Sequence, residues 1–188
     1  MNRSQTMSAK IKPLAPGMRI VGQARTIACM VGDNGAIHAA MRVAGSGDVL
    51  IIDAGGYPDT AVFGGLLTEA ARAAGVTGVV IDGAVRDREE IVALGYPVFA
   101  AAVVPAGPHK GFGGTIDGVI ACAGCPVAPG DIVLGDDDGV AVIPFGEQAA
   151  ILDAALAKIE KEAADLQALK DGQSLADRHG IPEPTVLP

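Results

Sequence analysis

The stretch GGLLTEAARAAGVTGVVIDGAVRDREE (Gly64–Glu90) predicts the centre of the fold. Apolar residues recur at helical spacing through Gly65–Gly75, and a glycine at that end is a typical helix stop. The run Gly78–Gly83 is short, apolar and β-branched, which is typical of a buried strand. A second helix is predicted over Arg88–Gly95. This order of helix, strand and helix indicates an α/β sheet with parallel pairing.

Short apolar runs on both sides of this stretch also have the length of strands. Strands alternate with helices over residues 48–104, which predicts a parallel βαβ half. Residues 115–144 instead predict antiparallel strands, with GDDDG (Gly135–Gly139) as a hairpin turn. The predicted strands are Arg19–Ala28, Asp48–Ala54, Gly78–Gly83, Pro97–Val104, Gly118–Gly124, Asp131–Gly135 and Gly139–Pro144, and a further short helix is predicted over His38–Ala44.

The longest helix is predicted near the C-terminus, over Glu147–Lys170, followed by a polar, turn-rich tail. Its apolar side chains follow one another by three or four residues and form one stripe, which could dock on its own domain or on a neighbouring subunit. We expect one domain over residues 1–188, with residues 1–17 as a loose N-terminus and residues 147–188 as a helix and tail that could exchange between subunits. The stripe consists of Leu152, Leu156, Ile159, Ala163, Leu166 and Leu169.

The composition predicts a soluble, cytoplasmic protein. No apolar run reaches the roughly 18 residues of a membrane span, and the polar start lacks the apolar core of a secretory signal. The net charge is −8, and no basic stripe with interleaved aromatic residues is present, so we expect neither nucleic acid nor a membrane as a partner. Three cysteines argue against a disulfide framework, and CAGC (Cys122–Cys125) leads into a turn, so packed thiols are favoured over a zinc or redox pair.

The stretch GAVRDREE (Gly83–Glu90) admits two interpretations. Asp87 could be the N-cap of the following helix, with Glu90 completing a capping box and no chemistry implied. However, the stretch follows a predicted strand, and α/β sheets bind ligands at the carboxyl ends of their strands. The loop GGYPDTAVFGG (Gly55–Gly65) also ends at a helix start, where free N–H groups could bind an anion, although its glycines could simply permit a tight turn.

Together, these groups suit the chemistry of a 2-oxo acid. Backbone N–H groups or Arg86 could hold its carboxylate, and Arg86 could offset the charge of an enolate. Asp87 is a hard oxygen ligand of the kind that Mg²⁺ or Mn²⁺ takes. No lysine lies in this edge region to form a Schiff base, which disfavours a lysine-dependent mechanism.

The quoted stretch, with GYPVFA (Gly95–Ala100) and CPVAPGDIVLGDDDGVAVIP (Cys125–Pro144), resembles the RraA-like family over roughly residues 20–145. The most specific part is Gly65, then twenty residues, Arg86-Asp87, two residues and Glu90. The family contains 4-hydroxy-4-methyl-2-oxoglutarate/4-carboxy-4-hydroxy-2-oxoadipate aldolases and the regulator of ribonuclease activity A. The resemblance implies a swivelling β/β/α domain, assembled as a homotrimer or a dimer of trimers with sites at subunit boundaries.

By this resemblance, Arg86 would hold the pyruvyl end of the substrate, Asp87 would anchor Mg²⁺ or Mn²⁺, and Glu90 would orient water. Many relatives carry an acidic residue at the place of Gly65, so here Asp82 or a residue of the next subunit would have to order metal-bound water. The pyruvate carboxylate would be bound by the backbone of Gly64, Gly65, Leu66 and Leu67.

The loop GPHKGFGG (Gly107–Gly114) offers His109 and Lys110 for the distal carboxylates of a substrate, or is simply mobile and solvated. His38 and His179 have no partners at ligand spacing and are predicted to be structural. We expect a divalent-metal-dependent aldolase that cleaves a 4-hydroxy-2-oxo di- or tricarboxylic acid to pyruvate and a second oxo acid, with oxaloacetate decarboxylation as a side activity. The alternative is a non-catalytic, protein-binding module like the ribonuclease regulator.

Overall fold

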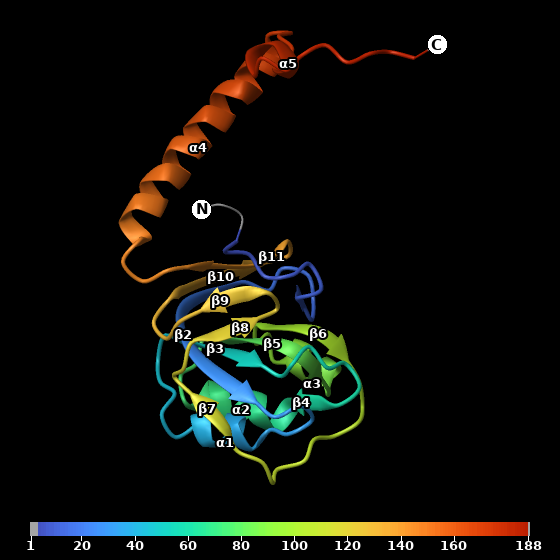
Figure 1. The fold of residues 1–188 in the computed structure, drawn as a ribbon, viewed down its shortest axis with the longest axis vertical. Helices are drawn as coiled ribbons and strands as arrows, with labels where there is room; N and C mark the ends of the chain where they lie inside the picture. The colour runs from blue at the N-terminus through green and yellow to red at the C-terminus, as the bar shows by residue number, and fades with distance from the viewer. Residues whose placement is uncertain (1–3, 188) are drawn as a thin grey trace. The chain divides into compact units, whose positions relative to one another are not determined.

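The computed structural model describes residues 4–187. They divide into two compact units, one ending at Gly146 and the other beginning at Glu147. The first unit is a mixed α/β structure, as predicted, and contains all of the strands (Figure 1). The strands are β1 (Lys12–Pro13), β2 (Ile20–Cys29), β3 (Asp48–Asp53), β4 (Ala61–Phe63), β5 (Gly78–Val85), β6 (Val98–Val103), β7 (Gly114–Ile116), β8 (Ile120–Cys122), β9 (Cys125–Val127), β10 (Ile132–Asp136) and β11 (Gly139–Ile143).

The main sheet has the strand order β1-β6-β5-β3-β2-β10-β11, with β4 also paired to β5 and β7 to β2. Strands β2, β3, β5 and β6 are parallel to one another. Strand β10 is antiparallel to both β2 and β11. The parallel half and the antiparallel half predicted from the sequence are therefore both confirmed; β10 and β11 share the main sheet with the parallel strands, while β8 and β9 form a separate two-stranded sheet.

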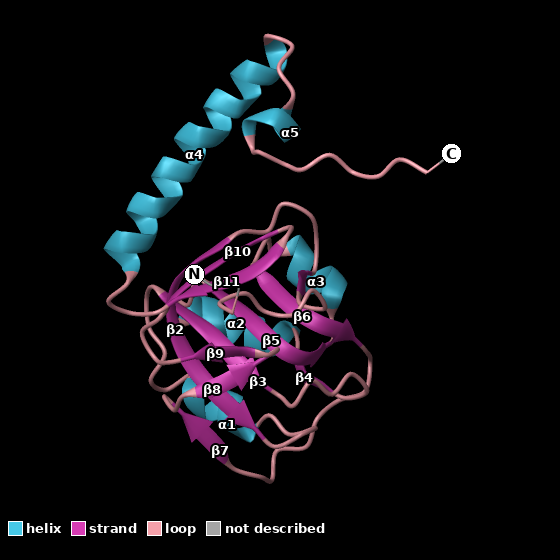
Figure 2. Ribbon diagram, turned by 45° about the horizontal axis from the view of Figure 1, so that its top comes forward, coloured by secondary structure: helices cyan, strands magenta, loops and turns pink. Residues whose placement is uncertain are grey.

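Short helices lie beside this sheet (Figure 2). The first unit contains α1 (Gly35–Ala40), α2 (Gly65–Ala73) and α3 (Arg88–Ala93), and the second contains α4 (Gln148–Lys170) and α5 (Leu175–Arg178). Each of the first three helices follows a strand, so its start lies at the carboxyl end of that strand. Each predicted helix has a counterpart, although α1 begins three residues and ends four residues before the predicted His38–Ala44; α5 and strands β1, β4, β7 and β9 were not predicted.

The core of the first unit is formed by the two central strands. In β5 every residue is buried, and in β3 the side chains of Val49, Leu50, Ile51 and Ile52 are fully buried. Parallel strands covered on both faces need such continuous apolar runs, because neither face meets water. The apolar runs that predicted these strands therefore also fix them at the centre.

The N-terminal segment is packed, so the prediction of a loose N-terminus is wrong for residues 4–17. The N–H of Met7 donates to the carbonyl of Val140 on β11 (2.9 Å), and the N–H of Leu14 donates to the carbonyl of Val98 on β6 (3.0 Å). Between them, Ile11 is fully buried. The segment thus joins the β11 edge to the β6 edge and nearly closes the sheet into a barrel, which protects edges that would otherwise be unpaired. Its apolar residues are too widely spaced among polar ones to reveal this in the sequence.

The hairpin β8–β9 contains the CAGC motif. Cys122 and Cys125 face each other across the two strands, and the turn residues between them have positive φ angles of 49° (Ala123) and 79° (Gly124), as a tight hairpin turn requires. Both cysteines are free and fully buried, and burial raises the pKa of each thiol. Burial also raises the pKa of the Cys29 thiol to about 12. The prediction of packed thiols is confirmed.

In the second unit, α4 carries the predicted apolar stripe, and most of it is solvent-exposed: Leu152, Leu156, Ile159 and Leu166 are each more than half exposed. Helix α5 folds back on α4 through Asp165, which contacts Arg178 (2.9 Å) and His179 (3.3 Å). His179 thus has a structural contact, as predicted. Within residues 4–187, no helix combines the length and the apolar character that a membrane crossing requires.

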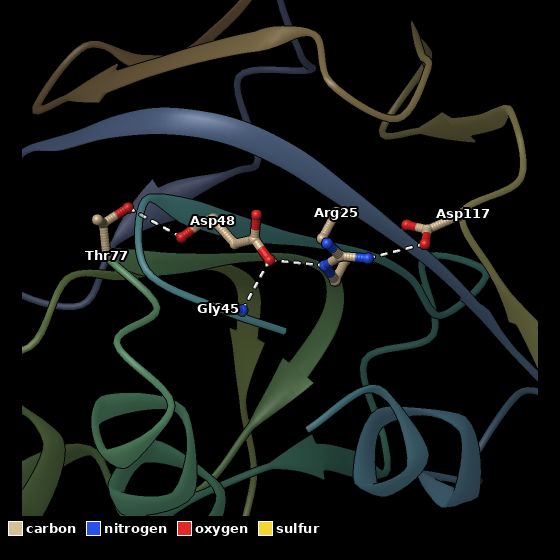
Figure 3. Close-up of polar contacts among 5 residues, drawn as sticks. All are labelled: Arg25, Gly45, Asp48, Thr77 and Asp117. Carbon is tan, nitrogen blue, oxygen red and sulfur yellow. Dashed lines mark hydrogen bonds and ion pairs between the residues drawn. The ribbon is translucent and has the colours of Figure 1, made fainter. Parts of the chain in front are cut away.

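An ion-pair network connects β2, the start of β3 and the turn after β7 (Figure 3). The guanidinium of Arg25 contacts Asp48 (2.6 Å) and Asp117 (2.7 Å). Asp48 also accepts the N–H of Gly45 (2.9 Å), and its carbonyl accepts the hydroxyl of Thr77 (3.0 Å). Because the side chain of Asp48 is only 15% exposed and that of Asp117 is 45% exposed, the first pair should contribute more to stability.

We predict that Arg25→Met lowers the free energy of unfolding by roughly 1–3 kcal/mol, because the partly buried Asp48 loses its charged partner. The matched variant Asp117→Asn should cost roughly 0–1 kcal/mol, because it removes only the exposed pair. Urea denaturation followed by circular dichroism measures both. Equal losses in the two variants would contradict this account.

Candidate active site

The unpredicted strand β4 brings two distant segments together. It runs parallel to β5, with Phe63 opposite Val85, and the N–H of Arg86 donates to the carbonyl of Phe63 (3.0 Å). Gly64 and Arg86, which directly follow the two strands, therefore lie side by side. Strands β3 and β5 are also neighbours and pair in parallel.

Asp87 adopts an unusual backbone conformation at the start of α3. Its φ of 58° is in the left-handed region, which costs on the order of 1–3 kcal/mol outside glycine and which the turn residues Asp117 and Ala123 also adopt. The carboxylate makes no capping hydrogen bond to its own helix. Its Oδ2 instead accepts the N–H of Gly65 (3.0 Å) and lies 3.4 Å from Nε of Arg86. The capping-box prediction is therefore wrong, because this conformation turns the carboxylate toward α2.

The packing at the start of α2 leaves little room for a side chain at its N-cap, Gly64, or at its first residue, Gly65. A Cβ at position 64 would lie 2.6 Å from Oδ2 of Asp87 and 2.9 Å from Cγ of Arg86. A Cβ at position 65 would overlap Oε2 of Glu90. The Glu90 carboxylate thus lies where a side chain at position 65 would begin. Many relatives are expected to carry an acidic residue at this position, so Glu90 places a carboxylate near the same point.

The first turn of α2 provides backbone donors. The N–H of Gly65 is already used by Asp87. The N–H groups of Leu66 and Leu67 have no acceptor within the helix, because the first turn lacks preceding carbonyls. The backbone of Gly64–Leu67 was expected to bind a carboxylate, and within it the N–H groups of Leu66 and Leu67 are available to a ligand. The helix dipole favours an anion at this end of α2.

A pocket opens beside these groups. Five of the predicted site residues line it: Gly64, Leu66, Leu67, Arg86 and Lys110. Asn34 and His38 also line it, although His38 was predicted to be only structural. Three basic side chains in one small pocket suit an anionic ligand. A larger, more open groove between the N-terminal segment and β10–β11 carries no comparable set of groups.

Other predicted residues lie outside the pocket lining. Asp87 and Glu90 lie next to Gly64 and Gly65, and His109 is exposed. Asp82 is buried, paired with Lys10 (2.7 Å) and bound to the N–H of Ala123 (2.8 Å), so it is already used in the structure of the barrel. Glu90, and not Asp82, is therefore the acid available beside Asp87.

The chain resembles proteins of one family throughout the first unit. The family model RraA-like, described as Aldolase/RraA, matches residues 1–142. A "Putative 4-hydroxy-4-methyl-2-oxoglutarate aldolase" of Halalkalibacterium halodurans is 39% identical over 88% of this chain and 79% of that protein. A 4-hydroxy-4-methyl-2-oxoglutarate aldolase of Thermus thermophilus is 36% identical over 67% of this chain and 76% of that protein.

A solved structure of an RraA protein also resembles this chain. The structure of the RNA-processing inhibitor RraA from Thermus thermophilis superposes with a TM-score of 0.68 at 33% identity. The match covers 75% of this chain and 87% of that one. Fold, sequence and family model agree, and the chain belongs to the RraA-like family.

Proposed function

We propose that the protein is a divalent-metal-dependent aldolase that cleaves a 4-hydroxy-2-oxo di- or tricarboxylic acid to pyruvate and a second oxo acid. The observation that carries the proposal is the pocket in which Arg86, Lys110 and the first turn of α2 face the same space. A substrate with a carboxylate at each end would suit these lining residues, because Arg86, Lys110 and the first turn of α2 can each bind an anionic group. The names of the aldolase relatives support the same class of reaction.

The acids beside the pocket fit a hard metal ion. Oδ2 of Asp87 accepts the N–H of Gly65 and lies 3.4 Å from Nε of Arg86, and among residues 4–187 no hydrogen bond reaches the Glu90 carboxylate. Asp87, with Glu90 beside it, would hold a Mg²⁺ or Mn²⁺ ion, because these ions keep several waters and take few protein ligands. When bound, the ion would polarise the 2-keto oxygen and reduce the charge of the enolate.

The remaining steps can be assigned to residues of the chain. The N–H groups of Leu66 and Leu67 would hold the C1 carboxylate. Glu90, directly or through water, would accept the proton of the C4 hydroxyl, and the C3–C4 bond would break. Arg86 would offset the negative charge of the pyruvate enolate until C3 is protonated. Oxaloacetate decarboxylation passes through the same enolate and is proposed as a side activity.

The second candidate is a protein-binding role without catalysis, which the similarity to the RNA-processing inhibitor RraA favours. The net charge of −8 would suit a basic partner. However, a binding role gives no reason for the strained Asp87 or for the Glu90 carboxylate above Gly65. We therefore place the aldolase first.

We also propose that the protein is a homotrimer or a dimer of trimers in which α4 packs on another copy. Leu152, Leu156, Ile159 and Leu166 follow the four-three spacing of a packing seam and are exposed in the single chain. Isolated helices are marginally stable in water, so an uncovered seam on a helix of 23 residues favours a partner.

The metal and Arg86 can be tested by pyruvate release from 4-hydroxy-4-methyl-2-oxoglutarate. We expect EDTA to abolish activity and Mg²⁺ or Mn²⁺ to restore it. Arg86→Ala should lower kcat by roughly 100-fold, because a preorganised charge at the enolate is lost. Arg72→Ala, which removes an exposed arginine paired with Glu69, is the matched control and should keep normal activity. Full activity in EDTA, or in Arg86→Ala, would rule out this mechanism.

The two glycines before α2 give a second test. Gly64→Ala should displace Arg86 and Asp87 and lower kcat by roughly 100-fold, as expected for small misplacements at an active site. Gly65→Ala should displace only the flexible end of Glu90, so stability should be unchanged while proton transfer slows. Gly45→Ala meets open space and serves as the control. Normal kcat in both Gly64→Ala and Gly65→Ala would contradict the assigned geometry.

The packing of α4 can be tested by light scattering after size-exclusion chromatography. The double variant Leu156→Glu, Ile159→Glu should shift the protein to a smaller assembly, because charges would be buried in the seam. Ala154→Glu lies on a different face of the helix and should leave the mass unchanged. An unchanged mass in the double variant would show that the seam does not hold copies together.

A further inference from the structure

We propose that Asp33 is a positioning residue that holds Lys110 in the pocket wall and so sets the distance between the two carboxylate-binding ends of the site. The proposal rests on the proposed function, because that function gives Lys110 the distal carboxylate of the substrate. Asp33 lies in the connection between β2 and α1, and only 1% of the residue is exposed.

The carboxylate of Asp33 binds two segments at once. Oδ1 accepts the N–H of Gly35 at the start of α1 (2.7 Å). Oδ2 accepts the N–H groups of Gly111 (2.8 Å) and Phe112 (3.1 Å). Three backbone donors on one buried carboxylate form a strong connection, because hydrogen bonds to charged groups are stronger than neutral ones.

Backbone bonds fix the other side of Lys110. The N–H of Asn34 donates to the carbonyl of His109 (3.0 Å), and the N–H of His109 donates to the carbonyl of Gly32 (2.9 Å). Lys110 therefore stands between two anchored points in a loop that has almost no regular structure of its own. The loop's position in the structure depends on these contacts and not on a helix or strand.

The neighbouring residue connects to the opposite wall. Nδ2 of the buried Asn34 donates to the carbonyl of Val62 on β4 (3.0 Å), two residues before Gly64. The dipeptide Asp33-Asn34 thus contacts both the loop of Lys110 and the strand that leads into α2. Its geometry fixes the span from Lys110 to the N–H groups of Leu66 and Leu67.

The charge state of Asp33 agrees with this role. Burial alone would raise its pKa, but the N–H groups of Gly35, Phe112 and Gly111, together with His109, hold the pKa below the ordinary value. Because the pKa of Asp33 is lower in the folded state than in the unfolded state, its ionised carboxylate stabilises the loop at pH values above the unfolded pKa of about 3.9. This stabilisation is lost as the pH falls through the lowered pKa of the folded state. The carboxylate is therefore ionised throughout the neutral range.

The test separates the two ends of the site. Exchange of the pyruvate methyl protons in D₂O with Mg²⁺ reports on the enolate end alone, whereas cleavage of 4-hydroxy-4-methyl-2-oxoglutarate also needs the distal end. In Asp33→Asn the amide keeps the size but loses acceptor atoms. We expect methyl exchange within about twofold of the wild type and a KM for cleavage raised about tenfold, which corresponds to about 1.4 kcal/mol.

A double-mutant cycle shows whether Asp33 acts through Lys110. Lys110→Met should raise KM to a similar extent, and the double variant should be no worse than Lys110→Met, because both changes remove one interaction. Asp117→Asn, an exposed aspartate outside the pocket, is the control. Additive effects, or methyl exchange that falls in parallel with cleavage, would overturn the proposal.

Amide hydrogen exchange of residues 108–113 gives a readout that does not depend on activity. Asp33→Asn should lose protection at Gly111 and Phe112, while α2 keeps its protection. Unchanged protection at these amides would overturn the proposal. A wild type with neither methyl exchange nor cleavage would instead refute the proposed function, and the protection data would still decide whether Asp33 holds the loop.

Discussion

The hydrogen bond from Gly65 N–H to the Asp87 carboxylate is the contact on which the site depends. It joins the end of β4 to the end of β5 across 22 positions of sequence. The bond directs the carboxylate toward α2 and accompanies the left-handed conformation of Asp87. It also leaves no room for a side chain at position 64, where a Cβ would meet Asp87, while a Cβ at position 65 would meet the flexible end of Glu90. One interaction therefore constrains the glycines, the arginine-aspartate pair and the acid beside them.

The sheet supplies the rigidity that makes this strain tolerable. Strands β3 and β5 are buried along their length, and the N-terminal segment connects the two outer edges. A strained backbone conformation persists only where contacts with the surrounding structure stabilise it by more than the strain costs. The nearly closed sheet meets that condition at the carboxyl ends of its parallel strands, which is where the residues of the site meet.

Features of the fold and the site could be predicted from the sequence where they depend on residues close together in the chain. Parallel strands that end on one edge were predicted and are confirmed, but strand β4, which sets Gly64 beside Arg86, was not predicted. The conformation of Asp87 could not be predicted, because it depends on the N–H of Gly65 at the start of another helix. In the sequence, Asp87 followed three residues later by Glu90 also looks like an ordinary capping box. Asp33 gave no signal either, since its partner Gly111 is 78 positions away. The packed N-terminus was missed for the same reason, because its contacts are with strands more than 80 residues away.

The two ends of the pocket are built in different ways, and this difference bears on how one fold can serve several functions. The end at Arg86 is fixed by strand pairing and by the start of α2, so a change there disturbs the sheet itself. The end at Lys110 lies on a loop held by Asp33 and a few backbone bonds. Such a loop can change in length or charge while the core stays intact. Substrate choice would then vary at the Lys110 end while the enolate chemistry is kept, and loss of the contacts at Gly64 and Gly65 would leave the same fold without a site.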